Sequence, residues 1–280
     1  EAHRANSTNP ALTGGVFYIF IYMDITNKLQ TSKYSKNNAV LKWLPGDTEE
    51  DFLDRLKKDP TNPSLLYYLE NPISYKLNNY GFRTPIDFVD AIEGNVFLGC
   101  SHTFGQGLHL ENTWSWKLNE YIGGNFLNLS VGGTGIGTAF RLLYGLKEII
   151  KPKNVFLYFP HPYRFEYFDP RQNRWNTTMS AWDPKNRLIV EKNNMEMFYH
   201  LHFNAIQSIC KELNTPLHAV NNYIGPKDDR KHITFPDCAR EVHSSPSAHI
   251  SLFEVFKEVY NSKAEPYSKP IDFDKPKNFI

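Results

Sequence analysis

Three reactive side chains stand next to each other where an apolar run ends, in the stretch NVFLGCSHTFGQG at 95–107. The run predicts a buried strand, and the glycines predict a sharp turn after it. Ser101 at such a turn is a candidate nucleophile, although a serine is weak until a neighbouring base takes its proton, and helix caps also favour serine. We expect Cys100 to pack as a small buried side chain and His102 to point to the side opposite Ser101.

A glycine-rich turn follows the next apolar run, in NLSVGGTGIGT at 128–138. It lacks the lysine of a phosphate-binding loop, and its glycine spacing differs from that of a dinucleotide-binding turn. Free backbone N–H groups beside the start of a helix suit a developing oxyanion, and the N–H of Gly133 is the candidate donor. Glycines that only permit a tight turn are the alternative.

A candidate base lies late in the chain, in PDCAREVHSSPSAH at 236–249. His243 has carboxylates two and six residues before it, on Glu241 and Asp237. A histidine held by a carboxylate acts as a general base near neutral pH, although a single loop histidine is more often simply solvated. The order of nucleophile, oxyanion donor and base, each after a predicted strand, makes the three signals stronger together than alone.

Strands and helices alternate from residue 95 onward, and this alternation predicts how the candidate groups meet. Short connections between them predict a three-layer α/β/α sandwich with a mainly parallel, flavodoxin-like sheet. In such sheets the reactive site lies at the carboxyl ends of the strands, where Ser101 and the glycine-rich turn fall. We expect strands at 95–99, 125–131, 154–159 and 216–223, and helices at 113–123, 138–150, 193–213 and 245–261.

An α-rich appendage precedes this α/β domain and is expected to pack on it. It contains one firm helix, in GDTEEDFLDRLKKD at 46–59, and a shorter one between prolines at 62–72. Met23 reads like a natural start, and a short packed strand is the equal alternative for the residues before it. The predicted divisions are an extension or cloning remnant at 1–22, the appendage at 23–90, the domain at 91–265 and a C-terminal tail at 266–280.

Composition argues against several classes of function. A net charge of +1 gives no general attraction for nucleic acid or an anionic membrane. The apolar run at 16–23 is too short to span a bilayer, which needs ~20 residues. Three cysteines leave at least one unpaired and their spacing fits no zinc site, so we expect no disulfide framework, no metal and no organic cofactor. A cytoplasmic or virion-associated location is preferred over secretion, and the sequence does not specify an oligomeric state.

Together these blocks resemble the GDSL/SGNH hydrolases, over residues 75–265. The likeness is to divergent members, frequent in marine bacteria and their phages, whose first block reads GCSHTFG or GCSFTFG. It continues through FLNLSVGGTGIGT, and NNYGFRTP at 78–85 is similar to an N-x-x-G-x-R lead-in that many such proteins carry. The resemblance implies that Ser101 is the nucleophile and one oxyanion donor, that Gly133 is the second donor, and that His243 is the base.

Two positions depart from the pattern of this family. The family carries an acid three residues before the histidine, where this chain has Arg240. Glu241 is preferred as the replacement, and Asp237 is the alternative. The third-block asparagine, normally an oxyanion donor, is absent from FPHPYRFEYF, where His161 and Arg164 are the candidates to substitute. A missing donor costs ~10²–10³ in rate.

The expected function is that of a serine esterase, which hydrolyses small acyl esters through an acyl-enzyme. Acetyl groups on a carbohydrate are a fitting substrate, so the expected partner is an acyl ester or an acylated glycan. Transfer of the acyl group to a sugar instead of water would use the same residues. The alternative is a weakly active or inactive domain of this type that binds carbohydrate or serves as a virion structural component. The changed acid position and the missing third-block asparagine favour this alternative.

Overall fold

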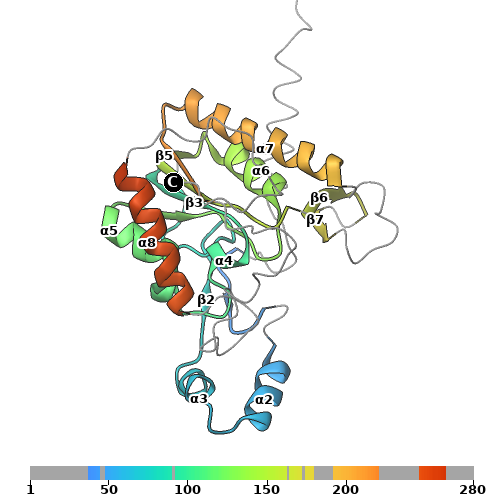
Figure 1. Ribbon diagram of the computed structural model, residues 1–280, viewed down its shortest axis with the longest axis vertical. Helices are drawn as coiled ribbons and strands as arrows, with labels where there is room; N and C mark the ends of the chain where they lie inside the picture. The colour runs from blue at the N-terminus through green and yellow to red at the C-terminus, as the bar shows by residue number, and fades with distance from the viewer. Residues whose placement is uncertain are drawn as a thin grey trace, which may run out of the picture.

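A four-stranded parallel sheet forms the centre of the molecule (Figure 1). The computed structural model describes residues 37–44, 48–89, 92–162, 164–171, 174–179, 192–220 and 246–262. The strands are β3 (Ile92–Leu98), β4 (Phe126–Asn128), β5 (Ile150–Tyr158) and β8 (Leu217–Val220). Their order is β4-β3-β5-β8, and every neighbouring pair is parallel. The predicted α/β fold with a parallel sheet is confirmed.

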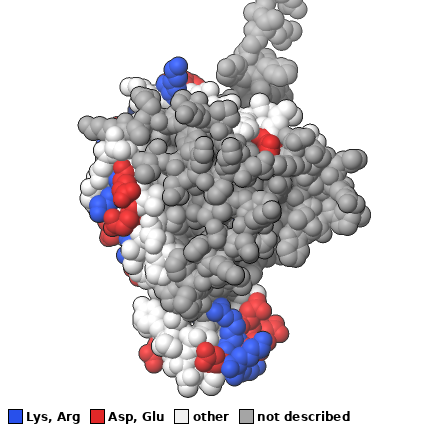
Figure 2. All heavy atoms as spheres, viewed as in Figure 1, with Lys and Arg blue, Asp and Glu red and all other residues white. Residues whose placement is uncertain are grey.

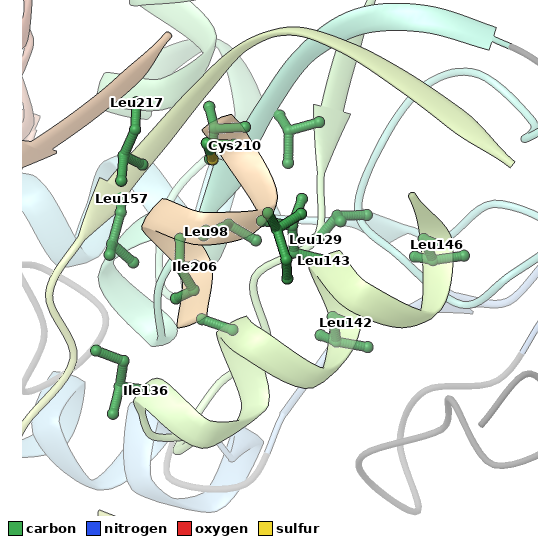
Figure 3. Packing of buried hydrophobic residues seen from close by; sticks show 14 of the residues in the cluster. Leu98, Leu129, Ile136, Leu142, Leu143, Leu146, Leu157, Ile206, Cys210 and Leu217 are labelled. Carbon is green, nitrogen blue, oxygen red and sulfur yellow. The ribbon is translucent and has the colours of Figure 1, made fainter. Parts of the chain in front are cut away.

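Helices cover both faces of the sheet, and they are α5 (Trp114–Ile122), α6 (Ile136–Leu146), α7 (Lys192–Glu212) and α8 (Pro246–Ser262). Successive side chains of a strand point to opposite faces. On β3, Val96 and Leu98 therefore pack in one core with α6 and α7, part of which Figure 3 shows. Phe97, between them, packs in a second core with α5 and α8. These two cores complete the three-layer sandwich.

Local side-chain hydrogen bonds set the ends of several elements. Thr113 caps α5, since its hydroxyl accepts the N–H of Trp116 at 3.2 Å, and Gly123 ends that helix as predicted. β4 is shorter than predicted because the chain turns out of the sheet after Asn128. The Oδ1 of Asn128 accepts the N–H of Ser130 at 3.1 Å, which stabilises this turn.

A β-hairpin that was not predicted follows β5. Its strands β6 (Arg164–Asp169) and β7 (Arg174–Met179) pair antiparallel with each other and, within the described residues, with no other strand. Phe165 packs against Phe198 of α7, with ring centroids 5.1 Å apart. The hairpin therefore stands at the carboxyl end of β5, beside α6 and α7 (Figure 1).

The elements that precede β3 are β1 (Val40–Leu41), α2 (Glu49–Lys58), α3 (Pro63–Glu70) and β2 (Tyr75–Lys76). Their apolar side chains form a third core, which also contains Phe104 and Leu108 from the segment after β3. On the face in Figure 2, charged side chains of both signs gather over α2 at the lower end of the molecule. The predicted segments 1–22 and 266–280 lie outside the described residues.

The part of the chain that the structure describes contains two free cysteines and no cluster of potential metal ligands. Cys100 and Cys210 are free and buried, and burial raises the pKa of Cys210 to about 12, so this thiol is unreactive. The described residues contain no group of three His, Cys, Asp or Glu side chains that could hold a metal ion. No described helix is long and apolar enough to cross a membrane.

A row of hydrogen-bonded polar side chains, buried except for the half-buried Asn154, crosses the sheet from α5 to β8. Asn95 Nδ2 donates to Asn119 Oδ1 at 2.9 Å, and Asn154 Nδ2 donates to Asn95 Oδ1 at 2.9 Å. His218 ends the row, with its Nε2 3.4 Å from Asn154 Oδ1 and its ring stacked on Phe156. Burial lowers the pKa of His218 to about 4, so the ring is neutral at pH 7.

We expect acid to destabilise the fold through His218. The unfolded ring titrates near its ordinary pKa of 6.5 and the folded ring at about 4, so the unfolded state binds more protons between these values. The stabilisation is complete above the unfolded pKa and is lost as the pH falls towards the folded one, by up to about 3 kcal/mol. Urea unfolding of wild type and His218→Gln as a function of pH measures this difference. The same pH dependence in both proteins would contradict it.

Candidate active site

Ser101 lies at the carboxyl end of β3, an inner strand of the sheet. The chain passes from β3 to β4 on one side and then to β5 on the other, so the direction of strand addition reverses at β3. Ligand sites of open α/β sheets lie outside the carboxyl ends of the strands at such a reversal. Ser101 begins the short helix α4 (Ser101–Phe104) and is 2% exposed. The candidate nucleophile therefore stands where this fold concentrates ligand sites.

The turn between β3 and α4 requires a glycine. Gly99 has a φ of +155°, and a Cβ there would collide with a side chain of α4 and lie 2.9 Å from the carbonyl oxygen of Tyr158. Cys100 is buried beside it, with its Sγ 4.0 Å from Ser101 Oγ. The His102 ring packs edge-on against Tyr158, with centroids 6.2 Å apart. Through the contacts of Gly99 and His102 with Tyr158, the ends of β3 and β5 pack closely beside Ser101.

The glycine-rich turn after β4 lies against Ser101. A side chain on Gly132 would place its Cβ 3.9 Å from Ser101 Cβ and 2.8 Å from Gln106 Oε1. Gly133 is exposed and has a φ of +78°, a conformation that favours glycine. Among the described residues, the N–H groups of Ser101 and Gly133 have no hydrogen-bond acceptor. Two unused donors therefore lie on the two turns that meet at the candidate nucleophile, and such donors can form an oxyanion hole.

Buried hydrogen bonds hold α4 to its neighbours on both sides. Asn128, at the end of β4, donates from Nδ2 to the carbonyl oxygen of Thr103 at 3.3 Å, and its Oδ1 accepts from both the N–H and the hydroxyl of Ser130. From α5, the hydroxyl of Ser115 donates to the same Thr103 carbonyl at 3.2 Å. The nucleophile turn, the glycine-rich turn and the start of α5 are thus connected through one carbonyl group.

His161 and Arg164, the predicted substitutes for the third oxyanion donor, follow the carboxyl end of β5. Arg164 Nη1 donates to the carbonyl oxygen of Thr134, in the glycine-rich turn, at 3.2 Å, and its buried Nε has no hydrogen-bond partner among the described residues. The N–H of Arg164 donates to the His161 carbonyl at 3.3 Å. The hydroxyl of Tyr199 donates to the Pro160 carbonyl at 3.4 Å, and burial raises the pKa of Tyr199 well above its ordinary value. The structure therefore brings Arg164 to the glycine-rich turn.

A buried ion pair, which the sequence analysis missed, fixes the hairpin to α6. Glu166 of β6 accepts from Nε and Nη2 of Arg141 at 2.9 and 2.8 Å and from the Thr138 hydroxyl at 2.8 Å. The Arg141 guanidinium carbon also lies 4.7 Å from the ring centroid of Trp175 on β7. Alternating residues in RFEYFD and RWNTTM, with turn-forming residues between, are the sequence signal that would have predicted this hairpin.

Replacing Glu166 with glutamine is expected to lower the free energy of unfolding by about 3 kcal/mol. Both charged side chains are less than a tenth exposed, so the change leaves the Arg141 guanidinium buried without its counter-charge. Urea unfolding measures the loss. A double variant with methionine at both positions removes both charges and should regain most of the stability. A free energy of unfolding for Glu166→Gln within about 1 kcal/mol of wild type, which is the usual contribution of an exposed ion pair, would contradict the burial of this ion pair.

The predicted base and its candidate acids lie outside the described residues, namely His243, Glu241 and Asp237. The nearest described element is α8, which begins at Pro246, three residues after His243. In the first turn of α8, His249 is buried and its Nδ1 accepts the N–H of Trp114 at 3.0 Å. The start of α8 is thereby fixed to the start of α5, next to α4.

The described fold defines a class of protein, an α/β protein in which a parallel sheet lies between two layers of helices. Its candidate site combines a serine, a glycine-rich turn and an arginine at the carboxyl edge of the sheet. A scan of the sequence against protein-family models finds no match, and a search of curated proteins finds none either.

Solved structures similar to this chain include TesA and several esterases. TesA is 13% identical, and the match covers 60% of this chain and 98% of that chain with a TM-score of 0.31. Esterase EstA from Pseudoalteromonas sp. is also 13% identical, over 60% of this chain and 97% of that one, with a TM-score of 0.31. An acetyl xylan esterase from the rumen bacterium Butyrivibrio proteoclasticus is 9% identical, over 63% and 65%, with a TM-score of 0.33. At such values, no activity or residue role is transferred to this chain.

Proposed function

We propose that this protein is a serine esterase that hydrolyses small acyl esters, with acetyl groups on a carbohydrate as the expected substrate. One observation carries the proposal. Ser101 lies at the reversal point of a parallel sheet, with the glycine-rich turn packed against it and unused N–H groups on both turns. The resemblance of the sequence blocks to the GDSL/SGNH hydrolases supports the same chemistry and suggests the substrate class.

In the proposed reaction, the Ser101 hydroxyl attacks the ester carbonyl while His243 accepts its proton. The negative charge that develops on the carbonyl oxygen is stabilised by the N–H groups of Ser101 and Gly133. His243 then gives the proton to the leaving alcohol, which leaves an acyl group on Ser101. Water, activated by His243 in the same way, releases the acid and restores the serine.

The anchoring of α8 supports His243 as the base. Three residues span at most about 11 Å, so chain connectivity keeps His243 near Pro246. The first turn of α8 is bonded to Trp114, and the next residue, Ser115, is bonded to the Thr103 carbonyl in α4. Of the carboxylates that would orient the base, we propose Glu241 ahead of Asp237.

Arg164 is the proposed third donor to the oxyanion, ahead of His161. Its guanidinium is bonded to the glycine-rich turn through the Thr134 carbonyl, and its Nε–H has no acceptor among the described residues. A guanidinium stays protonated over the whole range of enzyme assays and donates to oxygen anions, so it suits this role better than an imidazole.

Covalent labelling tests the proposal without knowledge of the natural substrate. A fluorophosphonate probe reacts with an activated serine, so the native protein should gain a single adduct that peptide mapping places on Ser101. Protein unfolded by heat should gain none, because the activation depends on the assembled site. A folded protein that stays unlabelled, or carries the label elsewhere, would remove the basis of the proposal.

One observation favours a second function, that of an inactive domain which binds glycans or serves in a virion. Ser101 is only 2% exposed, although a nucleophile must meet its substrate. Under this alternative the folded protein shows neither labelling nor ester hydrolysis, but it binds acetylated xylan oligosaccharides in a calorimetric titration. Labelling of Ser101 excludes it.

A further inference from the structure

Arg83, which comes before the α/β domain, is buried against the segment that follows the candidate nucleophile. It is 1% exposed. Its Nη1 donates to the carbonyl oxygens of Phe104 at 3.0 Å and Gly105 at 2.6 Å, and its Nη2 donates to that of Leu108 at 2.8 Å. These acceptors lie 21 to 25 residues further along the chain, so the contact joins two distant parts of the sequence.

The surroundings of Arg83 hold its planar group in one orientation. The guanidinium carbon lies 4.7 Å from the ring centroid of Tyr75 and 5.5 Å from that of Phe104. Among the described residues, no carboxylate lies within ion-pair distance of Arg83, so its direct hydrogen-bond partners are carbonyl oxygens, while the more distant charge of Glu111 also favours the charged form. Burial lowers the pKa of Arg83 to about 10, which still leaves it protonated at neutral pH. A buried cation is costly unless its donors are satisfied, and here three carbonyl oxygens of one short segment satisfy them.

The carbonyl groups that Arg83 binds belong to the same turn as Ser101. The N–H groups of Gly105 and Gln106 both donate to the Ser101 carbonyl, at 2.9 and 3.1 Å. The side chain of Gln106 in turn faces Gly132, in the turn that carries the proposed oxyanion donor. Arg83 therefore holds the backbone segment that is bonded to the Ser101 carbonyl and that carries Gln106, the residue facing the glycine-rich turn.

A second contact between the appendage and this turn acts in the same direction. The hydroxyl of Tyr75, on β2, accepts the N–H of Gly107 at 2.8 Å. His109, just beyond, stacks on Tyr68 of α3 with ring centroids 5.8 Å apart. Residues 104–109 are thus bonded to the appendage on one side and continue into α4 on the other.

We propose that Arg83 is a positioning residue for the nucleophile, and that the described appendage, residues 37–44 and 48–89, serves as a clamp on the turn at 101–109. The role assigned to Ser101 rests on the proposed esterase function, whereas the clamp itself does not. Without Arg83, the carbonyls of residues 104, 105 and 108 lose their common donor, and the turn samples orientations in which the Ser101 hydroxyl does not face its base.

The test compares Arg83→Lys and Arg83→Met with Ile206→Ala, a cavity-forming change in the main core that is remote from the turn. Lysine keeps the charge but cannot reproduce the fork that reaches three carbonyls. Hydrogen exchange of the full chain is measured by segment. We expect exchange of the amides in 101–109 to rise at least about tenfold in both Arg83 variants relative to Ile206→Ala, at conditions of equal global stability.

Kinetics provide the readout that a purely structural role would not move. For both Arg83 variants we expect kcat on a short acyl ester to fall ~10–100-fold, with KM within about threefold of wild type, since a misplaced nucleophile affects the chemical step. Ile206→Ala, at equal stability, should keep its kcat. The rate of fluorophosphonate labelling should fall in parallel with kcat.

The outcomes of these experiments separate the clamp from the esterase function. Unchanged exchange at 101–109 in both Arg83 variants overturns the clamp, and so does a fall in kcat that Ile206→Ala shares. Raised exchange together with a wild-type protein that neither labels nor hydrolyses esters sinks the esterase function but supports the clamp. Raised exchange with the selective loss of kcat supports both.

Discussion

Ser101→Ala is expected to reduce ester hydrolysis by a factor on the order of 10⁴ or more, to the residual rate that substrate binding and the oxyanion donors support without a nucleophile. The hydroxyl is the proposed attacking group, and it stands on a turn whose own N–H has no acceptor among the described residues. Among the described residues, the hydrogen-bond partner of Ser101 Oγ is Cys100 Sγ, at 4.0 Å. The fold should therefore tolerate the change, and the free energy of unfolding should stay within about 1 kcal/mol of wild type.

Kinetics on a short p-nitrophenyl ester, together with urea unfolding, measure both parts of this result. Ser208→Ala is the matched control, because Ser208 lies on α7 and its hydroxyl bonds only within that helix, to the Asn204 carbonyl. Its activity should equal that of wild type. Full activity in Ser101→Ala would assign any hydrolysis to another group and end the proposed mechanism.

His243→Ala is expected to have an effect of similar size, ~10⁴-fold, because without a base the serine keeps its proton. The pH profile makes the prediction specific. A general base must be neutral, so kcat/KM of the wild type should rise with pH through a midpoint near the ordinary histidine value of about 6.5. This midpoint should disappear from the residual activity of His243→Ala.

The acid that orients His243 is identified by comparing Glu241→Gln with Asp237→Asn. The true partner should cost ~10²–10⁴ in kcat, and the other substitution should leave it nearly unchanged. His200→Ala, on α7, controls for the loss of a histidine elsewhere. If His243→Ala retains the rate and the pH midpoint of wild type, the base has been assigned wrongly.

Much of the fold is predictable from patterns that are local in the sequence. The buried apolar run of β3, the Thr113 cap of α5 and its end at Gly123 are each set by residues within a few positions of one another. The alternation of such elements then predicts a parallel sheet, which places Ser101 and the glycine-rich turn at one edge. Their contact in the structure, through Gly132, follows from the topology.

The features that escaped prediction depend on partners distant in the sequence. Glu166 is an ordinary strand residue until Arg141 of α6 is placed beside it. The sequence shows Arg83 as part of the NNYGFRTP motif but does not indicate what it binds, because its acceptors are backbone carbonyls, which every residue has. Neither side chain could be assigned a task from spacing alone.

The hairpin β6–β7 shows where this protein could most easily change. Its two strands are hydrogen-bonded to each other, and it is attached to the rest of the molecule by side chains such as Arg164, Glu166 and Trp175. The residues that join the two strands can therefore be lengthened, shortened or exchanged without removing a hydrogen bond from the central sheet.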